Sequence, residues 1–543
     1  MGARGPEGYL CMALHAHLPY VRHPEHPYFL EENWLYEAMT ECYIPLLDMF
    51  SRLVNDRVDF RITVSLSPSL AEMLRDELLM QRYSDYVERL MELAERESRR
   101  NKGDCSFGPV VSMYQKRFRR IHYLFGDVYG RDLVSGFRQL QQNGHLEIIP
   151  SAATHAYLPH LSHHPGAVKA QIRIGLQQYR DNFGRAPDGI WFPECGFAPG
   201  FDDYIKEEGL SFFFLESHGI IRGVPSPRFG TSLPVSCRSG IAAFGRDAEA
   251  SRQVWSSFGG YPGDHDYRDF YRDAGFDVDG DHVKAFLKPY GTKTFTGLKY
   301  YRITGNTERK EPYNVERAMM KADEHAGHFI RCSEDRVRNL FGKMKKRPVI
   351  TPTYDAELFG HWWFEGIHWL EALFRKMNRR GRTIRMISPS GYLNMEEGDR
   401  HMQISHPSAS SWGEKGYHEV WLNDRNDYIY RHLLKASERM TALADRFAHA
   451  EGILRRALNQ AAREILLSQH SDWTFMIKND SDAGYARNRF QMHIGRFAWL
   501  YDSILSGNLQ ESRLAEIEDR DRIFPNIDYR VYRSMHEKAG RAG

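Results

Sequence analysis

Short apolar runs recur along the first 400 residues, and several of them end in a residue with reactive chemistry. Their length and their content of β-branched and aromatic residues are typical of strands. The runs lie at 9–17, 60–66, 146–149, 190–192, 211–215, 347–355 and 384–388. Segments with apolar residues at helical spacing lie at 167–183, 201–209 and 363–378. Because strands alternate with helices, we expect an α/β fold built on a parallel sheet or barrel.

After about residue 400 the pattern changes to long amphipathic helices, expected at 426–449, 453–468, 485–505 and 514–522. The sequence therefore predicts two parts, an α/β catalytic barrel over 1–400 and an all-helical C-terminal domain over 401–543 that contributes to the same cleft. A mostly helical insertion is expected at about 69–144. The segment 223–240 is rich in Pro and Gly and lacks periodicity, so we expect a lid loop over the strand ends.

Two carboxylates stand alone at the ends of predicted strands. Glu194 follows an apolar run in GIWFPECGFAPG, and Asp355 ends another in RPVITPTYDAE. In α/β barrels the C-terminal strand ends carry the reactive groups. A carboxyl pair in that position suggests a general acid and a nucleophile for cleavage of a glycosidic bond. The alternative is that each carboxylate caps the next helix or binds an arginine.

Histidines form a second group of candidates. The strand expected at 9–17 places His15 and His17 on one face, since side chains alternate along a strand. His155, in SAATHAYLP, follows the strand expected at 146–149. Two imidazoles at the end of a first strand are also the pattern of metal-dependent hydrolases, in which they ligate zinc or a related ion. Structural or hydrogen-bonding histidines are the third interpretation.

Five segments, taken together and in order, resemble the successive blocks of glycoside hydrolase family 57. They are HAHLPYVRHPE (15–25), SAATHAYLP (151–159), GIWFPECGF (189–197), TYDAELFGHWWFEG (353–366) and SSWGEKGYHEVWLN (410–423). The similarity is greatest to the α-1,4-glucan branching-enzyme subgroup and extends over about residues 9–473. It implies a distorted (β/α)7-type barrel with helical insertions and an all-helical C-terminal domain.

The resemblance also implies a retaining double-displacement reaction on an α-1,4-glucan such as amylose, glycogen or a maltooligosaccharide. Glu194 is then expected as the nucleophile and Asp355 as the general acid/base, with no metal and no cofactor. The family pattern indicates further residues in contact with the glucan, namely His15, His17, His155, Trp255, His361, Trp362, Trp412, Trp421, Asp472 and Trp473. For Trp362, core packing of the following helix is the alternative.

The segment 223–240 does not settle whether the acceptor of the reaction is a glucan hydroxyl or water. In the branching subgroup the corresponding loop carries a tyrosine associated with keeping water from the glycosyl-enzyme, whereas Phe229 and Ser232 occupy this neighbourhood here. A branching enzyme is our first hypothesis and a retaining α-amylase our second. Two further hypotheses are a metal-dependent hydrolase or deacetylase that uses His15, His17 and Asp355, and a catalytically silent glucan-binding protein.

Composition narrows the choice of partners. The chain has 73 basic against 71 acidic residues, which gives no reason to expect nucleic acid or an anionic membrane. No apolar run approaches the roughly 18 residues of a membrane span, and the N-terminus lacks a signal-peptide pattern, so we expect a cytoplasmic monomer or small homo-oligomer. The 6 cysteines are scattered, which predicts neither a disulfide framework nor a thiolate metal site. Aromatic residues make up 13% of the chain, and their faces can stack on sugar rings as well as fill a core.

Overall fold

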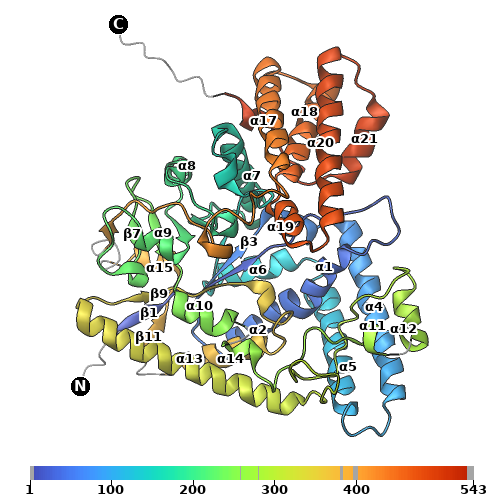
Figure 1. Cartoon of the computed structure of the whole chain (residues 1–543), viewed down its shortest axis with the longest axis vertical. Helices are drawn as coiled ribbons and strands as arrows, with labels where there is room; N and C mark the ends of the chain where they lie inside the picture. Colours follow the sequence, from blue (N-terminus) through green and yellow to red (C-terminus); the bar gives the residue numbers. More distant parts are fainter. Residues whose placement is uncertain (1–4, 257–258, 279, 380–382, 396–401, 535–543) are drawn as a thin grey trace.

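A ring of parallel strands forms the centre of the protein, in a computed structural model that describes residues 5–256, 259–278, 280–379, 383–395 and 402–534 (Figure 1). Around the ring the strand positions are β1 with β2 (Gly8–Leu10, Ala13–Ala16), β3 (Ile62–Leu66), β4 (Leu146–Ile149), β5 (Gly189–Ile190), β6 (Phe212–Leu215), β8 (Ala242–Gly245), and β9 with β10 (Val349–Ile350, Thr353–Asp355). The described strands thus occupy seven positions, and the predicted (β/α)7-type barrel is confirmed.

Two joints of the ring are made by isolated contacts rather than by a full ladder of hydrogen bonds. The β4 and β5 positions meet through a bridge between Ser151 and Trp191. The β8 position is joined to β9 and β10 by a hydrogen bond of 2.8 Å from the Asp247 N–H to the Thr351 carbonyl. Short pairing at these two joints makes the barrel irregular.

The register of three neighbouring strands brings polar residues to one end of the barrel. His15 in β2 lies opposite Asp355 in β10 and opposite Ser65 in β3. The three strands are parallel, so their carboxyl ends lie at the same edge, where α/β barrels carry their reactive groups. A candidate site is therefore expected at this edge.

Helices cover the outside of the barrel where the hydrophobic pattern predicted them. They include α7 (Pro165–Phe183), α8 (Phe201–Glu207) and α14 (Gly366–Met377). Helix α7 ends at Gly184, whose φ of 68° is a left-handed conformation that glycine adopts without steric cost. The predicted last strand is β11 (Ile384–Met386), which pairs in parallel with β1.

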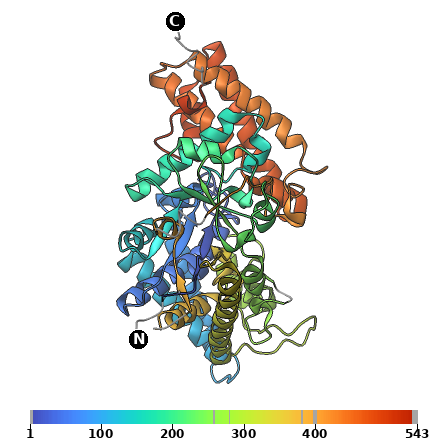
Figure 2. The same cartoon turned by 90° about the vertical axis from the view of Figure 1, so that its left-hand side faces the viewer.

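The expected helical insertion comprises α3 (Pro68–Met73), α4 (Glu77–Arg100), α5 (Gly108–Tyr123) and α6 (Leu133–Gln142). The sequence analysis missed α13 (Val315–Met344), a helix of 30 residues. Its first turn is capped by Asn314, whose side chain accepts a hydrogen bond from the Arg317 N–H. Helix α13 packs along α14 and runs past the end of the barrel that lies away from the C-terminal helices (Figures 1 and 2).

The segment 223–240 differs from the predicted lid. Within it, β7 (Val235–Ser236) pairs antiparallel with β8 and parallel with β12 (Gln403–Ile404). Phe229 packs against an apolar cluster that includes residues of β1, β6 and β8. Strand pairing and apolar packing therefore hold this segment along the side of the barrel.

The C-terminal helices are α17 (Tyr428–Arg446), α18 (Gly452–Ser468), α20 (Ala483–Ser506) and α21 (Glu511–Arg520), as the sequence predicted. A further helix, α19 (Ser471–Asn479), lies between them and the barrel (Figure 1). The residue before it, His470, forms a β-bridge with Ala156 in the segment that follows β4. The predicted domain boundary at residue 400 lies outside the described residues. No helix in the described ranges is both long and apolar enough to cross a bilayer.

Candidate active site

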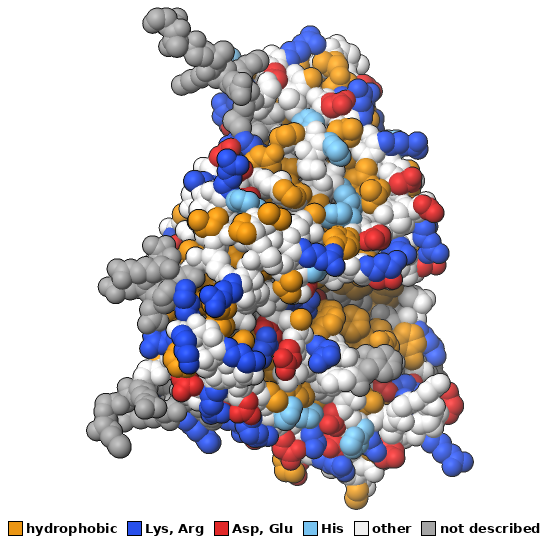
Figure 3. Space-filling model, turned by 60° about the vertical axis from the view of Figure 1, so that its left-hand side comes forward, with side chains coloured by type: hydrophobic (Ala, Val, Ile, Leu, Met, Phe, Trp, Pro, Cys, Tyr) orange, Lys and Arg blue, Asp and Glu red, His pale blue; other side chains and the backbone are white. Residues whose placement is uncertain are grey.

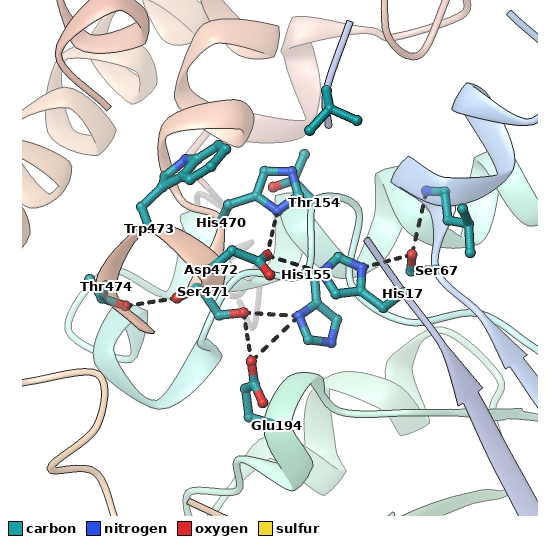
Figure 4. Close-up of polar contacts among 12 residues, drawn as sticks. His17, Ser67, Thr154, His155, Glu194, His470, Ser471, Asp472, Trp473 and Thr474 are labelled. Carbon is teal, nitrogen blue, oxygen red and sulfur yellow. Dashed lines mark hydrogen bonds and ion pairs between the residues drawn. The ribbon is translucent and has the colours of Figure 1, made fainter. Parts of the chain in front are cut away.

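Glu194 lies just beyond β5 in a sharply turned backbone. Its φ is 61°, and His155, beyond β4, has a φ of 53°. This left-handed region is uncommon for residues that carry a Cβ, and such strain collects at functional sites. The two turns bring the side chains together, with His155 Nδ1 3.8 Å from Glu194 Oε1 (Figure 4).

Two donors hold the Glu194 carboxylate. Trp412 donates from Nε1 to Oε2 at 2.8 Å, and Ser471 donates from Oγ to Oε1 at 2.9 Å. Burial raises the pKa of Glu194, while the hydrogen bonds from Trp412 and Ser471 lower it. The two donors therefore offset part of the cost of a negative charge in this partly buried position.

A chain of hydrogen bonds leads from β3 to Glu194. The contacts are Ser65 Oγ to His15 Nδ1 at 3.0 Å, His15 Nε2 to His155 Nε2 at 2.9 Å, and His155 Nδ1 to Ser471 Oγ at 2.9 Å. Because an ionised Glu194 only accepts, Ser471 donates to it and each group behind donates forward. This assignment needs two neutral imidazoles, and burial does hold the pKa values of His15 and His155 well below the usual range.

His17 connects the barrel to α19. Its Nδ1 lies 2.9 Å from Ser67 Oγ, its Nε2 lies 3.0 Å from Asp472 Oδ2, and its ring stacks on His155 at 3.6 Å (Figure 4). His470 Nδ1 approaches the same Asp472 oxygen at 3.3 Å. Although burial opposes ionisation, His17 and His470 hold the pKa of Asp472 well below its usual range. Asp472 is therefore an anion that orients the histidines.

Asp355, at the end of β10, is in an environment that favours its protonated form. Burial raises its pKa well above the usual value, and the charges of Glu357 and Glu194 act in the same direction, whereas Arg246 opposes them. A carboxyl group that keeps its proton can act as a general acid. The charge of Glu194 also raises the pKa of Asp355, which indicates that the two predicted carboxyls lie near each other.

A cleft of about 750 Å³ opens beside Asp355. Its walls are formed by residues within 255–272, 303–310 and 355–363, and none of its lining residues belongs to 223–240. On the face drawn in Figure 3, hydrophobic side chains gather in a hollow within a surface that mixes both signs of charge. The segment after β8, rather than the predicted lid, therefore walls the cleft.

Aromatic rings are exposed in this cleft. Tyr271 is 77% exposed, Trp362 is 52% exposed and Trp255 is 51% exposed. Phe270 lies against Trp362 with a ring separation of 4.3 Å. Flat aromatic faces of this kind can stack on the apolar faces of sugar rings. Trp255 and Trp362, two of the predicted glucan contacts, thus line this cleft together with Tyr271 and Phe270.

Three other predicted contacts do not line this cleft. Trp421 is buried and stacks on Tyr157 at 4.2 Å. Trp473 is fully buried, and its Nε1 donates to the Leu467 carbonyl at 2.8 Å. His361 Nδ1 lies 2.7 Å from Glu41 Oε2. In this structure Trp421 and Trp473 present no face to a ligand, and His361 lies outside the cleft lining.

The predicted lid residues, Phe229 and Ser232, do not line this cleft either. Phe229 packs under the side chains of Arg228 and Lys346, and Ser232 ends the short helix η5 (Gly230–Ser232). Sequence reasoning missed Ser65, Ser67 and Ser471. The alternation of Ser65 and Ser67 along β3 was a usable signal, since it places both hydroxyls on one face.

The site residues that could ligate a metal ion differ from the set that the metal-dependent hypothesis used. His17, His470 and Asp472 each offer a ligand atom within 4.8 Å of the others. The ring nitrogens of His15 are instead occupied by Ser65 and His155. The predicted trio of His15, His17 and Asp355 is not among the groups of described residues with metal-ligand spacing.

Comparison with known proteins identifies the family to which this chain belongs. Residues 11–406 match the model of glycosyl hydrolase family 57. Residues 432–532 match the model of the C-terminal region of 1,4-alpha-glucan branching enzymes. The chain belongs to glycoside hydrolase family 57, as the resemblance of its motifs indicated.

The similar proteins include branching enzymes and an α-amylase. A 1,4-alpha-glucan branching enzyme of Thermococcus kodakarensis is 34% identical over 95% of this chain and 77% of its own length. Among solved structures, the α-amylase AmyC of Thermotoga maritima is 41% identical with a TM-score of 0.90, over 97% of this chain and 99% of that one. A branching enzyme of Pyrococcus horikoshii is 33% identical with a TM-score of 0.87, over 97% of each chain.

Proposed function

We propose that this protein is a retaining α-glucan enzyme that cleaves α-1,4 links and transfers the chain to a 6-hydroxyl, the activity of a 1,4-alpha-glucan branching enzyme. The observation that carries the proposal is the pair of partly buried carboxyls at the strand ends, Glu194 and Asp355, of which the first raises the pKa of the second. Similarity to branching enzymes along nearly the whole chain supports transfer as the outcome.

The reaction would proceed in two displacements. In the first, the Glu194 carboxylate attacks the anomeric carbon while Asp355 gives its proton to the departing glycosidic oxygen. In the second, a hydroxyl of the acceptor attacks the same carbon, Asp355 takes its proton, and the bond to Glu194 breaks. Two inversions at one carbon retain its configuration.

The surrounding residues would hold and orient the glucan. Trp255 and Trp362 offer exposed rings in the cleft beside Asp355. Trp412 orients the nucleophile by its hydrogen bond to Glu194. We also assign contact with the sugar to His17 and Asp472, whose side chains are partly exposed. His15 and His155, predicted for the same role, are buried and would support these groups through their hydrogen bonds. The buried Trp421 and Trp473 support these groups by packing.

Incubation of the purified protein with amylose tests the proposal. Reducing ends are counted before and after treatment with an enzyme that cleaves α-1,6 links only. We expect few free reducing ends before this treatment and many new ones after it. Glu194→Gln, which keeps the size of the side chain, should lower turnover by about 10³-fold or more. Unchanged turnover in this variant would instead support a silent glucan-binding protein.

A retaining α-amylase is the second candidate, and two observations favour it. AmyC shares 41% of its residues with this chain. In addition, the segment 223–240 is paired along β8 and does not line the cleft. Hydrolysis and transfer share the covalent intermediate and differ in the acceptor. If reducing ends rise at once and debranching adds none, water is the acceptor and the protein is an amylase.

Cytoplasmic location and a monomeric or small homo-oligomeric state stay predictions from the sequence. Cell fractionation and light scattering of the purified chain would test them.

A further inference from the structure

Arg246 and Glu216 form an ion pair at the carboxyl ends of two neighbouring barrel strands. Arg246 follows β8, and its backbone N–H donates to the Leu215 carbonyl at 2.7 Å, which continues the pairing of β8 with β6. Glu216 follows β6 directly. Arg246 Nη1 donates to Glu216 Oε2 at 3.0 Å, and both side chains are largely buried. Because the strands are parallel, the pair lies at the edge of the barrel that carries Glu194.

Further hydrogen bonds fix both side chains of this ion pair. Arg246 Nε donates to Ser251 Oγ at 3.2 Å, and Ser251 is buried in α10 (Ala248–Trp255). The other carboxylate oxygen of Glu216 accepts from the backbone N–H and from the hydroxyl of Ser217, each at 2.8 Å. A guanidinium that donates through two of its nitrogens has a fixed plane. The orientation of Arg246 is therefore set by contacts within the protein.

The fixed guanidinium lies over the ring of Trp412, with its Cζ 5.6 Å from the ring centroid. Trp191 packs against the same indole at a ring separation of 5.3 Å. Trp412 in turn contacts Glu194 twice, since Nε1 donates to Oε2 at 2.8 Å and the backbone N–H donates to the Glu194 carbonyl at 3.1 Å. An unbroken series of contacts thus leads from Glu216 through Arg246 and Trp412 to Glu194.

A cation over an indole ring has two effects on the group that the indole contacts. The cation is attracted to the face of the ring, so it restricts rotation of the side chain. It also draws electron density from the ring, which makes the Nε1–H of Trp412 a stronger donor to a carboxylate. Both effects reach Glu194 through Trp412, and both require the positive charge of Arg246 to stay in place.

We propose, building on the proposed function, that Arg246, paired with Glu216, is a positioning residue that holds the indole N–H of Trp412 on the nucleophile. With Oε2 held by Trp412 and Oε1 by Ser471, the Glu194 carboxylate cannot rotate away from the anomeric carbon. When the bond to the sugar breaks in the second displacement, the same N–H stabilises the negative charge that returns to Glu194.

Arg246→Met tests the proposal, because it removes the charge and keeps much of the length of the side chain. We expect kcat on amylose to fall about tenfold. KM should stay within about twofold, since neither Arg246 nor Trp412 lines the cleft. Arg246→Lys keeps a cation over the ring and should recover kcat to within about threefold of the wild type. Arg513→Met is the matched control, because Arg513 lies over Trp499 at 4.4 Å in the C-terminal helices, and it should keep the kcat of the wild type.

A double-mutant cycle shows whether Arg246 acts through Trp412. In Trp412→Phe the donor to Glu194 is absent, so adding Arg246→Met should lower kcat by less than about twofold further. A direct effect of the Arg246 charge on Asp355, whose pKa it lowers, would persist in that double variant. Glu216→Gln should lower kcat about as much as Arg246→Met, and the two changes together should cost no more than either alone.

The outcomes separate this proposal from the proposed function. If the wild type acts on α-glucan and Glu194→Gln does not, the proposed function stands. Losses from Arg246→Met that are as large in Trp412→Phe as in the wild type would then overturn the proposal, as would an Arg246→Lys variant no more active than Arg246→Met. Thermal unfolding of each variant is measured alongside, and the comparison of Glu216→Gln with Arg246→Lys decides the matter if Arg246→Met does not fold. If the wild type acts on no α-glucan, both the proposed function and the role of Arg246 are wrong.

Discussion

Trp412 donates a hydrogen bond of 2.8 Å from Nε1 to Oε2 of Glu194, across 218 residues of sequence. Ser471 reaches the other oxygen of the same carboxylate from the start of α19. The nucleophile proposed for the barrel is thus held by residues that follow it by more than 200 positions. The C-terminal part of the chain completes the site as well as covering it.

Trp412→Phe should shift the acidic limb of the pH profile. A hydrogen bond to a charged group contributes about 1.5–3 kcal/mol, so its loss should raise the pKa of Glu194 by about one to two units. Since Glu194 must be ionised to attack, we expect the acidic limb of kcat/KM to move up by that amount. Trp421→Phe is the control, because Trp421 stacks on Tyr157 and does not contact Glu194. A fixed acidic limb in Trp412→Phe would contradict this role.

Asp472→Asn should cost stability at neutral pH and little in acid. The folded-state pKa of Asp472 is depressed, so its contribution is present above the unfolded value of about 3.9 and is lost as the pH falls towards the folded value. We expect a loss of about 2 kcal/mol at pH 7 from the contacts with His17 and His470. Denaturant unfolding of both proteins at pH 7 and at pH 3 measures this. An equal difference at both pH values would be inconsistent with the assignment.

Gly175→Ala should disturb the turn that carries His155. A Cβ at this position of α7 would lie 2.6 Å from the Ser151 carbonyl oxygen and 3.1 Å from the Ala153 nitrogen. Backbone atoms cannot rotate away as a side chain can, so we expect a loss of about 1–3 kcal/mol and lower activity. Gly495→Ala, in α20, is the control, since a Cβ there meets nothing within 4 Å. It should stabilise the protein by up to about 1 kcal/mol, as judged by thermal unfolding.

Tyr271→Ala should weaken glucan binding without affecting folding. The side chain is 77% exposed and lines the cleft, so its loss removes a stacking surface and little packing. We expect KM for amylose to rise about five- to tenfold with a small change in kcat. Tyr123→Ala is the matched control, because Tyr123 is 49% exposed and does not line the cleft. Equal KM values in the two variants would remove Tyr271 from the substrate site.

Chelation should leave the activity unchanged. The reaction proposed for Glu194 and Asp355 uses only their carboxyl groups, and His17 is engaged by Ser67 and Asp472. We therefore expect full turnover of amylose after dialysis against a strong chelator. Stoichiometric zinc in the purified protein, with activity lost on chelation and restored by zinc, would favour the metal-dependent hydrolase instead. The cluster of His17, His470 and Asp472 would then be the place to look for the ion.

The sequence by itself determined most of the barrel strands and the two lone carboxylates, although it gave no sign of β8 (Ala242–Gly245). The runs at 146–149 and 211–215 became β4 and β6, because short apolar segments of β-forming residues leave few alternatives to a buried strand. Glu194 and Asp355 were visible because each follows such a run directly. Such features can be predicted from the sequence, because they depend only on residues that are neighbours along the chain.

The tertiary structure decided which side chains reach those carboxylates. Trp412 and Trp473 look alike in sequence, yet Trp412 contacts Glu194 while Trp473 is enclosed in the core. The segment 223–240 has the composition of a loop, but its backbone is paired with β8 and β12. Contacts of this kind join residues separated by tens to hundreds of positions. They cannot be predicted from local sequence patterns, because the packing of whole helices and strands brings the residues together.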